Sequence, residues 1–116
     1  MRYALLVYET EACVKARHDP EYQAAYNAYI KAIYGSGVAF AGSGLQDAAT
    51  TTTTYRLVGG ERHIQDGPFA DTKEQLAGFF LIDVPDLDKA LEWAARCPST
   101  ERGGIVEVRP ALEQPK

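Results

Sequence analysis

The first strand and the first helix are indicated by two different hydrophobic patterns. Residues 3–8 form an apolar run in which neither alternate face is polar, so they predict a central strand covered on both sides. Residues 9–17 are mostly polar and are expected to connect this strand to a helix. In that helix the apolar side chains recur at spacings of three and four, which predicts one continuous stripe. Asp19 can cap its free amides, Pro20 fits the first helical position, and Gly35 provides a stop signal.

The rest of the chain predicts mostly strands. Further strands are expected at residues 38–46, 50–58, 61–66, 79–84 and 105–109. Glycines in the first of these segments suggest a bulge or a close backbone approach. Gly59 and Gly60 predict a two-residue hairpin turn between the strands at residues 50–58 and 61–66. A second helix is expected to begin at Pro85 and Asp86 and to end near Cys97.

This order of elements predicts an α+β fold, with an antiparallel sheet and two helices on one face. The ferredoxin-like arrangement, a split βαβ unit repeated, matches it best. The 116 residues are expected to form one domain, residues 1–116, with a single core. Two helices on one face cannot cover both sides of the apolar runs at residues 3–8 and 79–84. The opposite face is therefore expected to be covered by a second subunit, which makes a homodimer.

Composition and charge exclude several classes of partner. The chain has 12 Lys and Arg against 16 Asp and Glu, a net charge of −4, and no basic cluster that would suit a nucleic acid. No run approaches the ~18 apolar residues of a membrane span, and the apolar run near the N-terminus is shorter than a secretory core of roughly 7–15 residues. Cys13 and Cys97 form no CxxC motif and are expected to be reduced thiols in a cytoplasmic protein, with a structural disulfide as the alternative. His18 and His63 are separate, which argues against a metal, and no cofactor motif is present.

Asp66-Gly67-Pro68-Phe69 ends one predicted strand and holds the best candidate for chemistry. The Asp66 carboxylate can bond backbone amides two residues on, as aspartate does before glycine in turns. Alternatively, apolar neighbours such as Phe69 raise its pKa, and it acts as a general base. His63 is the candidate catalytic partner, but residues three apart in a strand point to opposite faces, so a direct pair requires a bulge.

Three further residues are candidates for binding a substrate. Asp71 to Glu74 fits a variant of the capping box and predicts a short helical turn, from which Lys73 can contact an anionic ligand or remain solvated. Tyr8 can line a cleft between helix and sheet together with the tyrosines of the first helix. Phe69 is expected in the wall of a pocket that Asp66 faces, or in the dimer contact.

The run from residue 66 to residue 80, DGPFADTKEQLAGFF, resembles the DGPF branch of the YCII-related family of small bacterial proteins. The resemblance extends to residues 3–8, 81–84, 86–96 and 106–110. It implies a ferredoxin-like fold whose sheets pair into a dimeric α/β barrel. Asp71 stands where the branch more often has glutamate, and Ser43 stands where an acidic residue is expected. Neither histidine matches the one that the wider family is thought to pair with an aspartate.

The resemblance implies two functions of different classes. The first is a cofactor-independent enzyme that acts on a small metabolite by proton transfer, with Asp66 and His63 as its catalytic candidates. Phe69, Lys73 and Tyr8 are then its substrate-binding candidates. The alternative is a ligand-binding or interaction module, regulatory and working with an extracytoplasmic-function sigma factor.

Overall fold

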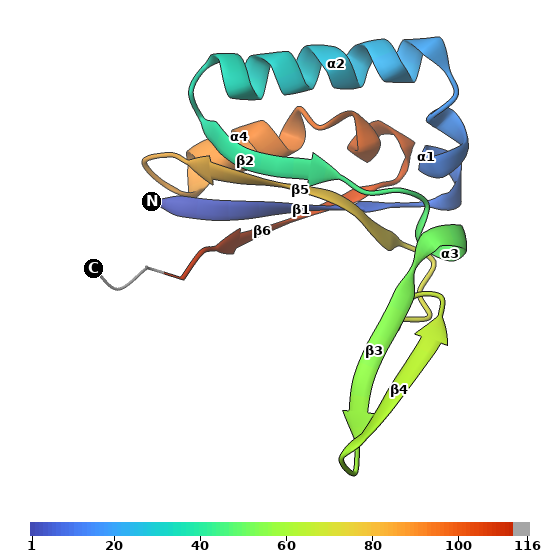
Figure 1. Ribbon diagram of the computed structural model, residues 1–116. Coiled ribbons are helices and arrows are strands. Elements are labelled where there is room, and N and C mark those ends of the chain that lie inside the picture. The colour runs from blue at the N-terminus through green and yellow to red at the C-terminus, as the bar shows by residue number, and fades with distance from the viewer. Residues whose placement is uncertain (113–116) are drawn as a thin grey trace.

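Residues 1–112 are described by the computed structural model, and their main feature is a four-stranded antiparallel sheet with helices on one face (Figure 1). The strand order is β2-β5-β1-β6. The sheet strands and the two main helices are β1 (Arg2–Glu9), α2 (Pro20–Gly35), β2 (Ala39–Gly44), β5 (Gln75–Asp83), α4 (Leu87–Ala95) and β6 (Ile105–Pro110). This is the predicted ferredoxin-like arrangement, in which each half contributes a strand, a helix and a strand.

The remaining elements are short or stand apart from the sheet. They are α1 (Glu11–Ala16), α3 (Ala48–Thr51), β3 (Thr53–Val58), β4 (Glu61–Asp66) and the 3₁₀ helix η1 (Pro98–Arg102). Strands β3 and β4 form a separate two-stranded sheet, joined by Gly59 and Gly60, both with positive φ as a type I′ turn requires. This hairpin extends from the end of the main sheet, on the side away from α2 and α4 (Figure 1).

The helices begin where the sequence predicts. The Asp19 carboxylate accepts a hydrogen bond from the Glu21 amide at 2.9 Å, and Pro20 occupies the first turn of α2. Asp86 caps α4 in the same way, accepting from the Lys89 amide at 3.0 Å. These caps satisfy amides that have no partner within the helix, and so fix each helix start locally.

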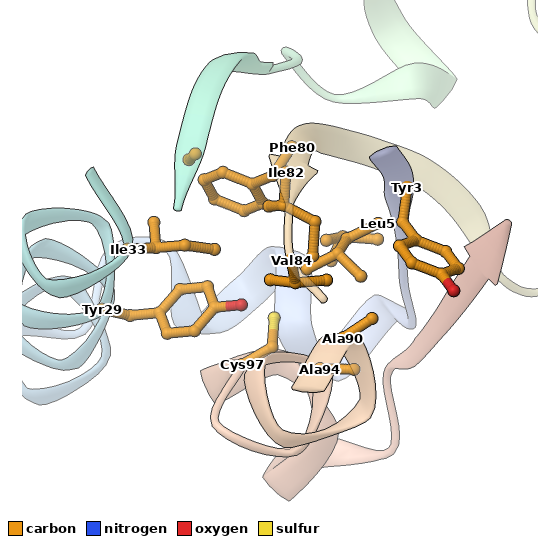
Figure 2. Close-up of a cluster of buried hydrophobic side chains, with 12 residues drawn as sticks. Tyr3, Leu5, Tyr29, Ile33, Phe80, Ile82, Val84, Ala90, Ala94 and Cys97 are labelled. Carbon is orange, nitrogen blue, oxygen red and sulfur yellow. The ribbon is translucent and has the colours of Figure 1, made fainter. Parts of the chain in front are cut away.

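The core lies between the sheet and the two main helices (Figure 2). Its buried residues are Tyr3, Leu5, Val7, Tyr29, Ile33, Ala39, Phe80, Ile82, Val84, Ala90, Ala94 and Cys97. Tyr29 of α2 packs edge-on against Phe80 of β5, and its hydroxyl donates to the Trp93 carbonyl of α4 at 2.8 Å. Each fully buried Leu or Ile side chain contributes about 1.5–3 kcal/mol, so this layer holds both helices on the same face.

Two predicted segments contain short helices instead. The polar connection at residues 9–17 contains α1, because the Thr10 hydroxyl caps the Cys13 amide and one side of the helix is buried. The strand predicted from residue 50 begins at Thr53. Before it, Asp47 accepts from the Ala49 amide at 3.0 Å and starts α3.

The helical turn predicted at Asp71 to Glu74 is wrong. These residues form no helix, and the Thr72 hydroxyl donates to the Glu74 carbonyl at 2.6 Å. The Gln75 side chain donates to the Thr72 carbonyl at 2.6 Å. Strand β5 starts at Gln75, several residues earlier than predicted. Side-chain bonds to nearby carbonyls therefore replace the capping box.

The glycines of β2 mark a bulge and a close approach, as predicted. The register between β2 and β5 shifts between Ala39 and Ala41. A Cβ atom on Gly42 would lie 2.5 Å from the Phe79 carbonyl oxygen, so only glycine fits there without a backbone shift.

Gly42→Ala is expected to lower the free energy of unfolding by about 1–3 kcal/mol, because the strands must separate to admit the methyl group. Urea denaturation measures this change. Gly44→Ala is the matched control, since a Cβ there meets nothing within 4 Å. Equal unfolding midpoints for the two variants would contradict the close approach.

Candidate functional site

A cleft of about 550 Å³ separates α2 from the edge of the sheet at β2 and β5. Its walls are mainly apolar, with Val7, Ile30 and Phe80 among them. Two glycines line it where the strands approach each other closely: a Cβ on Gly42 would lie 3.0 Å from the Tyr34 hydroxyl, and one on Gly78 would lie 2.9 Å from the Ser43 carbonyl oxygen of β2. A side chain at either position would require the neighbouring atoms to shift.

Glu9 lies at one end of this cleft and is only 5% exposed. Arg17 donates to its Oε1 from Nε at 3.0 Å and also from Nη2, and the Tyr22 hydroxyl donates to its Oε2 at 2.9 Å. A carboxylate offers about four acceptor positions, so these three donors leave one, on Oε2. Glu9 is therefore a buried carboxylate in the wall of the cleft, with one acceptor position that these donors do not use.

Arg17 fixes the end of the cleft. Its Nη1 donates to the Leu45 carbonyl at 2.9 Å, which ties the end of α1 to the loop after β2. Beyond it lies a second cavity of about 520 Å³, bordered by α1, α3 and the loop before β5. Glu9, Arg17 and Ala77 line both cavities, so the ion pair forms part of the wall between them.

A chain of buried hydroxyls continues from Glu9 into the protein. Tyr22 shares a hydrogen bond of 2.9 Å with the Ser99 hydroxyl, which also contacts the Tyr26 hydroxyl. Tyr26 in turn lies 3.3 Å from the Cys97 sulfur. Ser99, on η1, is fully buried. The network holds α2 against η1 while two of its tyrosines line the cleft.

Burial raises the pKa of Tyr22, Tyr26 and Tyr29. These phenols are therefore protonated at neutral pH and can donate hydrogen bonds, but they cannot act as bases. Burial also raises the pKa of Cys97, so this thiol lacks the thiolate character of a nucleophile. Cys13 and Cys97 are both free and buried, as predicted for reduced thiols.

The two predicted catalytic residues lie elsewhere. Asp66 and His63 are exposed on β4 and line neither of these two cavities in the described part of the chain. The register from β3 to β4 runs without the bulge that a direct His63–Asp66 pair needs. The acid–base role of these residues stays a prediction.

The predicted binding residues are also dispersed. Lys73 lines the second cavity, and Phe69 is 72% exposed on the loop after β4. Tyr8 points to the sheet face opposite the helices, since its neighbours Val7 and Glu9 point inward. A hydrogen bond to Glu107 raises the pKa of Tyr8 there. The structure thus brings none of these three into the cleft between α2 and β2.

Sequence reasoning missed Glu9, Arg17 and Ser99. The polar character of residues 9–17 assigns Glu9 to a connection, although strand alternation from Leu5 and Val7 puts it on the buried face. That alternation was the available signal. No local pattern marked Ser99, whose partners lie more than seventy residues away in sequence.

Neither a metal cluster nor a membrane span is found in the described chain. Within residues 1–112 no group of three or more His, Cys, Asp or Glu side chains is placed to hold a metal ion. Over the same residues no helix is long and apolar enough to cross a membrane.

Comparison with known proteins identifies the family. The YCII-related domain matches residues 1–114, and the chain belongs to the YCII-related family. An uncharacterised protein of Rhizobium meliloti (strain 1021) is 51% identical over 71 residues. That match covers 57% of this chain and 55% of the relative, so the chain spans about half the length of the relative. Membership of the DGPF branch stays a prediction.

A solved structure shares the fold. It is 5-chloro-2-hydroxyhydroquinone dehydrochlorinase from Burkholderia phenoliruptrix AC1100 in complex with 2,5-dihydroxybenzoquinone. The two chains superpose with a TM-score of 0.55 over 92% of this chain and 91% of the other, at 18% identity. At this identity the likeness shows the fold alone.

Stability is expected to fall above about pH 10, the ordinary pKa of tyrosine, because the unfolded chain then releases phenol protons that the folded chain retains. Each retained proton lowers the free energy of unfolding by about 1.4 kcal/mol per pH unit. Tyr26→Phe should reduce this slope, as measured by urea denaturation between pH 9 and 11. Tyr55→Phe, at a ring 56% exposed, is the control. Equal slopes in both variants would contradict the buried phenol network.

Proposed function

We propose that this protein is an enzyme that binds a small, oxygen-bearing metabolite in the cleft between α2 and β2 and moves a proton at Glu9 without a cofactor. The observation that carries the proposal is the carboxylate of Glu9, which is buried in the wall of the cleft and keeps one acceptor position that its three donors do not use. A carboxylate held in place by other donors meets the positional requirement of a general base.

The walls of the cleft favour a compact, largely apolar ligand. A volume of about 550 Å³ lies within the usual range of small-molecule sites, roughly 300–1,000 Å³. Val7, Ile30 and Phe80 offer surface to a ring or short chain. The hydroxyl of Tyr34 can donate to its oxygen substituents, because this side chain borders the cleft.

Arg17 positions Glu9 and attracts negative charge. Its bonds to Glu9 and to the Leu45 carbonyl use three of its five N–H groups, and the others can face a ligand. A substrate that becomes an enolate or phenolate as it loses a proton would be stabilised by this guanidinium. Tyr22 stays protonated and donates to Glu9, so it orients the carboxylate.

The structural neighbour supports the choice of a first probe. That dehydrochlorinase is named for a chlorinated hydroxyhydroquinone and was solved with 2,5-dihydroxybenzoquinone, a small ring with oxygen substituents. A ligand of this class suits a cleft with apolar walls and hydroxyl donors. We use it as a chemical class and not as the identity of the substrate.

A ligand-binding or regulatory module is the second candidate. One observation favours it: three donors already engage Glu9, so most of its acceptor capacity is used within the protein. Association with an extracytoplasmic-function sigma factor remains a prediction from the family resemblance. The two candidates differ in whether a bound molecule is converted.

Glu9→Gln keeps the shape of the side chain and removes its charge. We expect turnover to fall by roughly 10²–10⁴, the usual contribution of a general base, with probe binding changed only a few-fold. A thermal-shift screen of a metabolite library that includes 2,5-dihydroxybenzoquinone finds the ligand, and chromatography of the incubated ligand measures turnover. Asp66→Asn is the matched control. Loss of turnover in Asp66→Asn but not in Glu9→Gln would contradict the assignment to the cleft, and binding without conversion would favour the module.

Pairing of two chains is also proposed. The sheet face away from the helices carries Leu6, Leu81 and Phe40, and helices of the same chain leave it uncovered in the described residues. An apolar face of this kind is typical of an interface. Light scattering at micromolar concentration should therefore give the mass of a dimer, and a monomer mass throughout would contradict the pairing.

A further inference from the structure

The hairpin of β3 and β4, residues 53–66, forms an arm that stands clear of the rest of the fold (Figure 1). Its large apolar side chains are exposed: Tyr55 by 56%, Leu57 by 63% and Ile64 by 55%. A two-stranded hairpin is only marginally stable in water by itself. The arm therefore has apolar surface, and a need for support, that residues 1–112 do not meet.

Three of the four exposed large apolar side chains of the arm, Tyr55, Leu57 and Ile64, lie on one face, and the fourth, Val58, lies on the other. Tyr55 lies opposite Ile64, Leu57 opposite Arg62, and Thr53 opposite Asp66. Residues that face each other across an antiparallel pair share a face, and alternate residues do as well, so these six side chains lie together. The other face is more polar, with Arg56 opposite His63 and Thr54 opposite Gln65.

The apolar face carries a positive charge near the turn and a negative charge at the base of the arm. Arg62 lies near the turn, Ile64 in the middle and Asp66 at the base, with about 14 Å between the two charged positions at ~3.4 Å per residue. A two-fold axis through the middle brings Tyr55 and Ile64 against the same residues of a second arm. The same axis places Arg62 of each chain against Asp66 of the partner subunit, which makes two symmetric pairs. The face is thus complementary to itself, as an isologous interface requires.

We propose that the arms of two copies of this chain pack face to face through Tyr55, Leu57 and Ile64, with Arg62 paired to Asp66 of the partner subunit. The arm extends on the side of the sheet that the helices leave open, where the pairing proposed above takes place (Figure 1). The contact extends that pairing and does not depend on the ligand of the cleft. It gives the exposed Asp66 a role as an interface charge.

A charge swap tests the contact. Arg62→Glu and Asp66→Arg should each weaken dimerisation about tenfold or more, because each places like charges together at two symmetric positions. The double variant carries both changes and restores opposite charges, so its dissociation constant should return to within about threefold of the original. Sedimentation velocity over a dilution series measures the dissociation constants.

Arg56→Glu is the matched control, since it makes the same charge change in the same hairpin on the opposite face. It should leave the dissociation constant nearly unchanged. A double variant no tighter than the single variants, or a control that weakens pairing as much, would overturn the arm contact. Binding of 2,5-dihydroxybenzoquinone, measured on each variant, tests the cleft separately, so the failure of one proposal is distinguishable from the failure of the other.

Discussion

The burial of one carboxylate constrains the arrangement of the chain around the cleft. Glu9 is the last residue of the central strand β1, and its side chain is buried. An unpaired charge at this position would lower the stability of the fold by several kcal/mol. Its donors come from the end of α1 and the first turns of α2, and Arg17 also reaches the loop after β2. These segments must therefore meet at one point, and the ion pair that joins them forms an end of the cleft.

The same contact explains why the cleft is polar at one end and apolar along its walls. Tyr22 and Tyr26 lie on the face of α2 that packs toward η1, where Ser99 satisfies both hydroxyls. Farther along the helix, Ile30 and Tyr34 face β2. Glycine at positions 42 and 78 lets β2 and β5 pack closely beside the cleft, because a Cβ at either position would meet the backbone of the neighbouring strand.

The proposed enzyme and the proposed arm contact use opposite sides of the molecule. The cleft lies on the helical side of the sheet, and the arm extends from the other side (Figure 1). Asp66 and Phe69, which the sequence marked by their unusual turn, belong to the arm and the loop after it. The motif that begins at Asp66 identified the family correctly, but Asp66 itself, the predicted base, lines neither of the two cavities described above.

The sequence by itself determined the elements whose signals are local. The caps at Asp19 and Asp86 and the hairpin turn at Gly59 and Gly60 each depend on neighbours a few residues away. The predicted helical turn at residues 71–74 failed because side chains there bond nearby carbonyls instead of capping a helix.

Only the tertiary structure decided which distant residues meet. Glu9, Arg17, Tyr22 and Ser99 come from four separate elements or their ends, and Ser99 is brought to the tyrosines by the packing of η1 against α2. Periodicity along a segment tells which of its faces is buried, but not which residue of another segment that face contacts. The candidate site is formed by such contacts, because satisfying a buried carboxylate requires donors from separate segments, and their positions are fixed only when the whole sheet and its helices assemble.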